Sequence, residues 1–300
     1  MYPMGEPRSH GSADILLARG FAPHRVALED YVAYQWEAVG DLLGTRSIQR
    51  RDQLALRWLY DAVRQVGAPT SALDIGCAYG NHLFMLNAML GKPQSVELVG
   101  VDLFDKAIQV ANTFAEQIPG YSNCRFHLVD ITQGLPFPDS SFEAINACDV
   151  IEHLIDPRQS LLEMRRVARP GATIVLSTPL RDSVFKTLAR KANRLTKGRL
   201  YRSYYAGKDT SLGPTGMPIM ETPAGHDHVS EMNLTELQGL CRDLGLRIEQ
   251  MEPMSILSGS KWFGRHDFVL AGALALEAVH DRLRRPNWSH SVMLRLRSVR

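Results

Sequence analysis

The sequence predicts an α/β fold in which helices cover a mostly parallel β-sheet. From about residue 67 onward, short apolar runs alternate with longer segments whose apolar residues recur at helical spacing. A glycine-rich turn directly follows the first apolar run. Alternation of this kind builds strand–helix–strand units, whose crossovers make neighbouring strands parallel. The 300 residues, 45% of them hydrophobic, suffice for one such domain with additional segments around it.

The N-terminal part of the chain differs from this pattern. Residues 1–24 are rich in Gly, Pro, Ser and His without a period, which predicts a flexible tail. In residues 25–66, apolar and aromatic side chains such as Leu54, Trp58 and Leu59 recur at helical spacing. We therefore expect two helices here, which form an N-terminal cap before the first strand.

The main domain is predicted to comprise residues 67–180 and 225–276. Its first five strands are expected at "SALDIG", "VELVGVD", "CRFHLVD", "FEAINACD" and "GATIVLSTP", separated by helical patterns such as "NHLFMLNAML" and "FDKAIQVANTFAEQI". A helix at "NLTELQGLCRDLG" is expected to lead into a sixth strand, and "KWFGRHDFVLAGAL" predicts the last strand. The basic remainder, residues 277–300, predicts a C-terminal helix and tail.

An insertion at residues 181–224 interrupts the main domain. Its first part, "RDSVFKTLARKANRLTKGRLYRSYYAGK", carries nine Lys or Arg residues against one Asp. Apolar residues recur there at helical spacing, which predicts an amphipathic lid helix with a solvated basic face. The same charges would also suit recognition of an anionic acceptor, such as a phosphorylated compound, a lipid phosphate or an RNA end. Both interpretations remain open.

Composition limits the compartment and the partners. The formal net charge of +2 is too small to favour nucleic acid as a partner, although it does not exclude it. The four cysteines have no paired spacing, and the sequence contains neither a secretory leader nor a run of about 18 apolar residues. We therefore expect a reduced, cytoplasmic protein without a transmembrane segment. Its oligomeric state does not follow from the sequence.

The segment "ALDIGCAYGNHLFML" is the strongest local indication of a ligand site. An apolar strand ends in Asp74, and a helical pattern begins at Asn81. Small residues between them allow a tight turn and let the backbone approach a ligand closely. These residues are Gly76, Ala78 and Gly80.

Acidic residues end the next two strands. Asp102 follows the glycine turn by about 20 residues, where a carboxylate can accept hydrogen bonds from both ribose hydroxyls of an adenosine ligand. Asp130 ends the third strand and is placed to meet an adenine amine. Together with the turn, these two acids predict a site for an adenosine-containing ligand.

After the fourth strand, the stretch "ACDVIEHLIDP" places Asp149, Glu152 and His153 within five positions. In one interpretation, Asp149 and Glu152 form a capping box that starts a helix, and His153 is a partly buried polar residue. In the other, the three side chains share one helical face, converge beside the ligand and are able to bind a divalent cation. The two interpretations are compatible in part, because capping residues can also face a ligand.

Taken in order, these motifs resemble those of the class I S-adenosylmethionine-dependent methyltransferases. The resemblance rests on "LDIGCAYG", "GVDLFDKAI", "HLVDI", "LPFPDSSFEAINACDVIEHLIDP" and "ARPGATIVLSTP", and these downstream motifs disfavour a dehydrogenase on the same fold. It implies a Rossmann-like, doubly wound sheet of seven strands with an antiparallel last strand. It also implies S-adenosylmethionine as cofactor, bound by Asp74, Gly76, Ala78, Gly80, Asp102, Leu103, Asp130, Ile131 and Asp149.

Individual roles follow from the same resemblance. The glycine turn would line the methionine moiety, although Ala78 replaces the glycine most common at its position and narrows the turn. Asp102 would hold the ribose, and Asp130 with Ile131 would flank the adenine.

A second histidine segment extends the resemblance. "AGHDHVSE" contains His226 and His228, and together with "DVIEH" it is similar to the E-x-x-E-H…H metal site of small-RNA 2′-O-methyltransferases. A site of this type would bind Mg, Mn or Zn. Its ligands would be Asp149, Glu152, His153 and His228. Asp149 stands where that family carries the longer glutamate, and without a metal His153 or His228 would act as the general base.

These observations predict a biosynthetic methyltransferase that modifies a hydroxyl group of a small molecule or saccharide, with an anionic acceptor possible. Two alternatives stay open. One is an RNA 2′-O-methyltransferase with a divalent metal at the acceptor site. The other is a non-catalytic module that binds S-adenosylmethionine without turnover.

Overall fold

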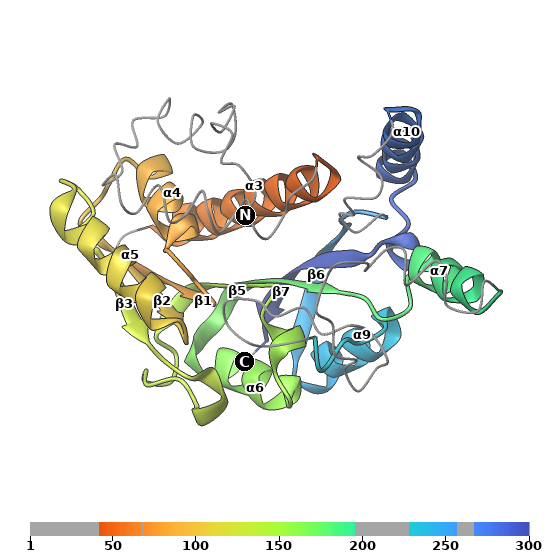
Figure 1. Cartoon of the computed structure of the whole chain (residues 1–300). Coiled ribbons are helices and arrows are strands. Elements are labelled where there is room, and N and C mark those ends of the chain that lie inside the picture. Colours follow the sequence, from red (N-terminus) through yellow and green to blue (C-terminus); the bar gives the residue numbers. More distant parts are fainter. Residues whose placement is uncertain (1–41, 68, 196–227, 257–266, 300) are drawn as a thin grey trace.

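A computed structural model describes residues 42–67, 69–195, 228–256 and 267–299 (Figure 1). They form one seven-stranded sheet with the strand order β3-β2-β1-β4-β5-β7-β6. The strands are β1 (Thr70–Ile75), β2 (Val96–Asp102), β3 (Cys124–Leu128), β4 (Phe142–Cys148), β5 (Ala168–Pro179), β6 (Leu246–Pro253) and β7 (Ser291–Ser298). Strands β1 to β5 pair in parallel, whereas β7 pairs antiparallel with both β5 and β6. The predicted α/β fold with an antiparallel last strand is confirmed.

Helices cover both faces of the sheet and create two hydrophobic cores (Figure 1). The first core lies under α3 (Leu42–Val66), α4 (Asn81–Met89) and α5 (Asp105–Gln117), and the second under α6 (Pro157–Val167) and α9 (Leu234–Asp243). Fully or almost fully buried apolar side chains of each helix meet the apolar faces of the strands, which is the main source of stability in such a layered fold.

Of the two helices expected before the first strand, the structure describes one. Helix α3 is 25 residues long and buries Trp58 and Leu59 against the sheet. It therefore packs into the core rather than merely capping it. The expected earlier helix, like the tail at residues 1–24, lies outside the described residues.

The predicted position of the last strand is wrong. "KWFGRHDFVLAGAL" was expected to form it, but Asp267–Leu283 is a helix, α10, and the strand is β7. Alanine and leucine dominate α10 and are the strongest helix formers. Basic residues such as Arg295 and Arg297 made this segment look like a solvated tail in the sequence. In the structure they lie in β7 and form ion pairs with Glu249 of β6. The predicted boundary between a domain ending at residue 276 and a terminal helix and tail is therefore wrong as well.

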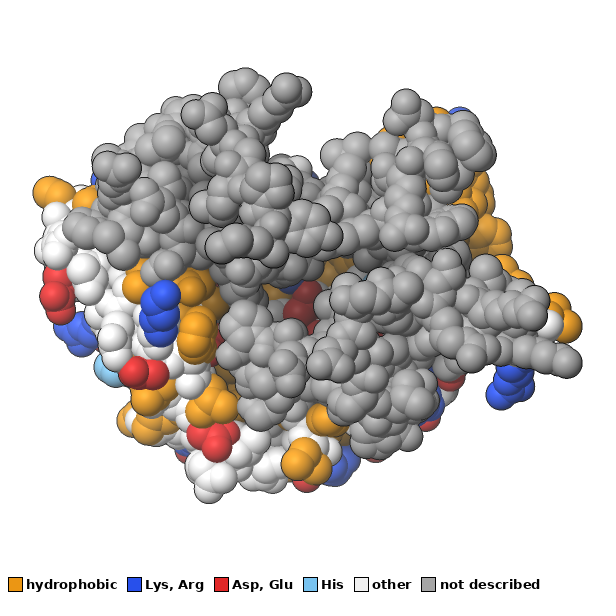
Figure 2. Space-filling model, viewed as in Figure 1, with side chains coloured by type: hydrophobic (Ala, Val, Ile, Leu, Met, Phe, Trp, Pro, Cys, Tyr) orange, Lys and Arg blue, Asp and Glu red, His pale blue; other side chains and the backbone are white. Residues whose placement is uncertain are grey.

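The expected helix near the start of the predicted lid insertion is present as α7 (Val184–Leu195). Three of its apolar residues, Val184, Leu188 and Leu195, are exposed. At the end of the molecule where Figure 1 labels α7, Figure 2 shows hydrophobic and basic side chains at the surface. The remainder of the insertion lies outside the described residues. Among the helices that the structure does describe, none combines the length and the apolar character needed to cross a bilayer.

Candidate active site

The carboxyl ends of β1 to β4 form one edge of the sheet, and the predicted site residues follow these strands. Strand β1 lies between β2 and β4, so the chain order reverses at this point of the sheet. Loops that follow two such strands run to opposite faces and leave a crevice in which ligands of open α/β sheets bind. The glycine turn after β1 and the Asp149 loop after β4 flank this crevice.

The glycine turn is anchored to β2. The backbone N–H groups of Gly76 and Cys77 both donate to the Val101 carbonyl, at 2.9 and 3.1 Å. Gly76, Ala78 and Gly80 all have positive φ, at 70°, 45° and 80°. A Cβ on Gly76 would lie 2.5 Å from Cγ2 of Val150, so this glycine is required by the packing of β1 beside β4. The turn is thus set by the protein itself.

Ala78 stores backbone strain, because an L-residue with a side chain pays about 1–2 kcal/mol in the left-handed region. Ala78→Gly would remove this cost and lose about 0.5–1 kcal/mol through the greater freedom of the unfolded chain. We expect a net gain in unfolding free energy of about 0.5–1 kcal/mol, measured by denaturant titration. Ala275→Gly, at an exposed position inside α10, serves as the control and should lose about 1 kcal/mol. A loss of that size at Ala78 would contradict the strain argument.

Asp102, the residue predicted to hold a ribose, is the last residue of β2. Its Oδ2 accepts a hydrogen bond from the Ala78 N–H and its Oδ1 accepts one from the Phe104 N–H, both at 2.8 Å. A carboxylate has about four acceptor positions, so two remain for a ligand. Leu103 beside it is exposed.

Asp130 lies just beyond β3 and begins a short 3-10 turn, η1 (Ile131–Gln133). Its Oδ1 accepts hydrogen bonds from both the backbone N–H and the hydroxyl of Thr132. Ile131 is buried next to it. The structure therefore places the predicted ribose and adenine residues after neighbouring strands, in the expected order.

The capping-box interpretation of Asp149 and Glu152 is wrong. The chain after Asp149 forms only a single 3-10 turn, η2 (Ile151–His153), without a side-chain cap. The α-helix that follows, α6, starts later, where Asp156 caps it by accepting from the Gln159 N–H. Asp149 has φ = 54°, and a left-handed residue interrupts the helical path that a capping box needs. The expectation of one shared helical face is wrong for the same reason.

The Asp149 side chain instead makes contacts with both β5 and α3. It accepts a hydrogen bond from the Ser177 hydroxyl at 2.6 Å and pairs with the Arg51 guanidinium. Partial burial opposes ionisation of Asp149, but the Arg51 charge and the Ser177 hydroxyl hold its pKa below the usual value. Asp149 is therefore a carboxylate directed toward α3.

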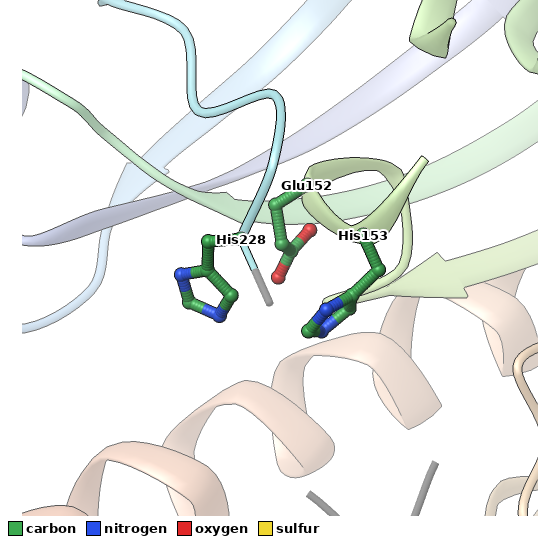
Figure 3. A group of neighbouring side chains, drawn as sticks. All are labelled: Glu152, His153 and His228. Carbon is green, nitrogen blue, oxygen red and sulfur yellow. The ribbon is translucent and has the colours of Figure 1, made fainter. Parts of the chain in front are cut away.

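Glu152, His153 and His228 form a separate group, in which the three side chains lie close together (Figure 3). One donor atom from each of them lies within 4.8 Å of the others, and the two imidazole rings are 5.0 Å apart at 72°. Glu152 is buried, and its burial together with the charge of Asp149 raises its pKa well above the usual range. Its Oε2 accepts from the Thr178 hydroxyl at 3.2 Å.

Backbone contacts bring these distant segments together. The carbonyl of Glu152 accepts hydrogen bonds from the N–H groups of Val229 and Ser230, which places His228 beside His153. Outside this group, His228 pairs with Glu231 at 3.0 Å. Three of the four predicted metal ligands thus meet, whereas Asp149 is not among them. His226 lies outside the described residues.

Three charged residues at this site were not predicted. Arg51 and Asp52 extend from α3, and His82 lies in the first turn of α4. His82 Nε2 is 3.1 Å from Asp52, and its Nδ1 is 3.6 Å from Asp74. The charges in "RRDQLALRW" interrupt an otherwise buried apolar pattern, which is the signal that could have identified the two α3 residues.

Comparisons with known proteins agree with this geometry. Residues 68–220, slightly over half of the chain, match the family model described as "Methyltransferase domain". A probable S-adenosylmethionine-dependent methyltransferase of Mycolicibacterium smegmatis is 27% identical over 194 residues, which cover 62% of this chain and 61% of the relative. A ubiquinone biosynthesis O-methyltransferase of Thiobacillus denitrificans is 25% identical over 202 residues, 67% of this chain and 74% of the relative.

The first three curated relatives are matched over only 31%, 37% and 61% of their own lengths. Among solved structures, the geranyl diphosphate C-methyltransferase of Streptomyces coelicolor superposes with a TM-score of 0.53 at 14% identity. This match covers 84% of this chain and 80% of that one, and it shows that the two proteins share a fold.

Proposed function

The chain belongs to the methyltransferase-domain family, and on this premise we propose that it is an S-adenosylmethionine-dependent methyltransferase acting on a hydroxyl group of a small molecule or saccharide. The observation that carries the proposal is the Glu152–His153–His228 group beside the crevice in which the cofactor is expected. It supplies proton acceptors next to the methyl donor. The family resemblance alone would not distinguish oxygen from nitrogen or carbon as the methylated atom.

The residues present fit the cofactor. Asp74, Gly76, Ala78 and Gly80 would surround its methionine moiety, and Oδ2 of Asp74 is buried without a hydrogen-bond partner among the described residues. The nearest charged group is His82, whose Nδ1 lies 3.6 Å from this oxygen and makes no hydrogen bond to it, so a donor group of the ligand would complete the bonding of Oδ2. Asp102 with Leu103 would hold the ribose, Asp130 with Ile131 the adenine, and Asp149 would close the methyl end.

The sulfonium of S-adenosylmethionine supplies an activated methyl group. When bound, the cofactor would give this methyl group to the acceptor oxygen and leave as S-adenosylhomocysteine, so the residues of this chain need only orient the acceptor and take up its proton. An aliphatic hydroxyl is a poor nucleophile at neutral pH, so its proton must be taken up. The imidazole of His153 or His228 accepts this proton in the proposal, and the crevice holds donor and acceptor in line.

A divalent cation would be an alternative to the histidine base. Glu152, His153 and His228 would hold it, and Asp149 would not take part, because it is directed toward Arg51. Two imidazoles in the donor set suit Zn better than Mg or Mn. Such a cation would lower the pKa of a coordinated hydroxyl.

Relatives support a small acceptor without identifying it. The Thiobacillus denitrificans relative is named as an O-methyltransferase of ubiquinone biosynthesis, and the Streptomyces coelicolor structure contains geranyl diphosphate. Basic residues of α7 would favour an anionic acceptor, since four Lys or Arg residues and no acidic residue lie in its 12 positions. We therefore propose a hydroxylated acceptor that carries an anionic group.

The test is a labelled-methyl transfer screen over metabolite pools, with and without chelator. Once an acceptor is found, we expect His153→Ala to lower kcat by about 100-fold or more while the Kd for S-adenosylmethionine is unchanged. His127→Ala, exposed on β3, is the matched control and should retain full activity. Chelator sensitivity would select the cation over the histidine base. Cofactor binding without transfer to any acceptor would favour a non-catalytic module.

A further inference from the structure

Helix α3 directs two adjacent opposite charges toward the candidate site. Arg51 pairs with Asp149 after β4, and Asp52 pairs with His82 in the first turn of α4. The side chains of Arg51 and Asp52 are only 18% and 26% exposed. Charges withdrawn from water are costly unless they are paired, so these two contacts constrain how α3 sits on the sheet.

His82 lies between two carboxylates. Its Nε2 is 3.1 Å from Oδ1 of Asp52, and its Nδ1 is 3.6 Å from Oδ2 of Asp74. A neutral imidazole has one N–H and can donate to only one of them, whereas an imidazolium can donate to both. Burial opposes the charged form, but the hydrogen bond and charge of Asp52, together with Asp74, raise the pKa of His82 to about 10.

The surroundings of Asp74 depend on whether His82 is charged. It is 1% exposed and ends β1 directly before the glycine turn, and its Oδ1 accepts from the Asn146 amide at 2.7 Å. A neutral His82 would accept from that same amide, whose nitrogen is 3.3 Å from Nδ1, and would leave Oδ2 of Asp74 without a donor. An imidazolium instead places a positive charge next to that oxygen.

We propose that His82, charged and held by Asp52, is a positioning residue that fixes Asp74 and the glycine turn for cofactor binding. The inference rests on the proposed cofactor site. Five groups of alternating sign then run from one side of the crevice to the other: Asp149, Arg51, Asp52, His82 and Asp74. Helix α3 supplies Arg51 and Asp52, and so it sets the spacing between the turn after β1 and the loop after β4.

The charge on His82 can be observed directly in the free protein by ¹⁵N NMR of the imidazole ring at pH 8. An ordinary histidine, with a pKa of about 6.5, is mostly neutral there. We expect both ring nitrogens of His82 to remain protonated, because Arg51 and Asp52 of α3, Asp74 of β1 and Asn146 of β4 surround it. His127 on β3 provides the reference signal of an exposed ring. A neutral His82 at pH 8 would overturn the proposal.

The link to the cofactor is tested by calorimetric titration with S-adenosylmethionine. We expect His82→Gln and Asp52→Asn each to raise Kd at least about 10-fold, with the double variant close to the single ones, because both changes interrupt one chain of contacts. His127→Gln is the control and should bind as the wild type does. Asp52→Asn keeps the buried imidazole ring of His82, so it can test the same contact if His82→Gln fails to fold.

The outcomes separate the two proposals. Wild-type affinity in both single variants, or losses that multiply in the double variant, would overturn the role of His82 and leave the proposed function intact. A wild-type protein that binds no S-adenosylmethionine would overturn both.

Discussion

Asp102→Asn is expected to raise the Kd for S-adenosylmethionine by about 100-fold. Both carboxylate oxygens of Asp102 already accept backbone N–H groups, one from Ala78 and one from Phe104. An asparagine amide has one oxygen, so in either orientation its NH₂ group would face a backbone donor. The variant would disturb the glycine turn and lose a charged acceptor for the ribose. Each hydrogen bond to a charged group contributes about 1.5–3 kcal/mol. A loss of about 2.7 kcal/mol of binding free energy corresponds to a 100-fold rise in Kd and lies within that range.

Isothermal titration of the wild type and the variant measures this effect. Asp105→Asn is the matched control, because Asp105 is an exposed acid three residues away whose side chain accepts from Gln109 within α5. It should bind the cofactor as tightly as the wild type. An unchanged Kd in Asp102→Asn would mean that the ribose is held elsewhere.

The second large effect is expected at Gly80, where alanine should lower the unfolding free energy by about 3 kcal/mol. Gly80 has φ = 80°, which costs a residue with a side chain about 1–2 kcal/mol. Its Cβ would also lie 2.5 Å from two ring atoms of Phe126, a buried residue of the first core. Overpacking of this kind typically costs about 1–3 kcal/mol. Because small domains have only about 5–15 kcal/mol in total, the loss is readily measured in guanidinium chloride.

Gly91→Ala separates the two contributions. Gly91 has nearly the same φ, 81°, but no atom lies within 4 Å of the position its Cβ would take. It should lose only the backbone cost of about 1–2 kcal/mol. Equal losses at Gly80 and Gly91 would show that Phe126 moves aside without cost.

The sequence was sufficient to predict features whose signals are local. Strands β1, β2 and β4 are mostly buried and largely apolar because both faces of the central sheet are covered, and such runs are visible without any alignment. Asp102 ends β2 and Asp130 lies just beyond β3, so their placement at one edge follows from the parallel topology. The tight turn after β1 is likewise a local feature, because small residues let the backbone turn there.

Features that depend on contacts between distant residues could not be predicted. Arg51 meets Asp149 across 98 positions, and nothing near either residue indicates the pair. The same contact draws Asp149 away from the metal-ligand set in which the resemblance had placed it. Residues 261–274 were predicted to form a strand, although α10 begins at Asp267, because apolar content alone does not distinguish a short strand from a helix.

The position of β7 has a consequence for biosynthesis. This strand is the last of the seven in the chain, yet it lies between β5 and β6 rather than at an edge. While residues 291–298 are still inside the ribosome, β5 and β6 each expose an unpaired backbone edge, which is a template for association with other chains. Completion of the sheet must therefore wait until this segment has emerged. Nascent chains stalled before residue 291 should bind chaperones that recognise extended segments, and release should follow once β7 has inserted.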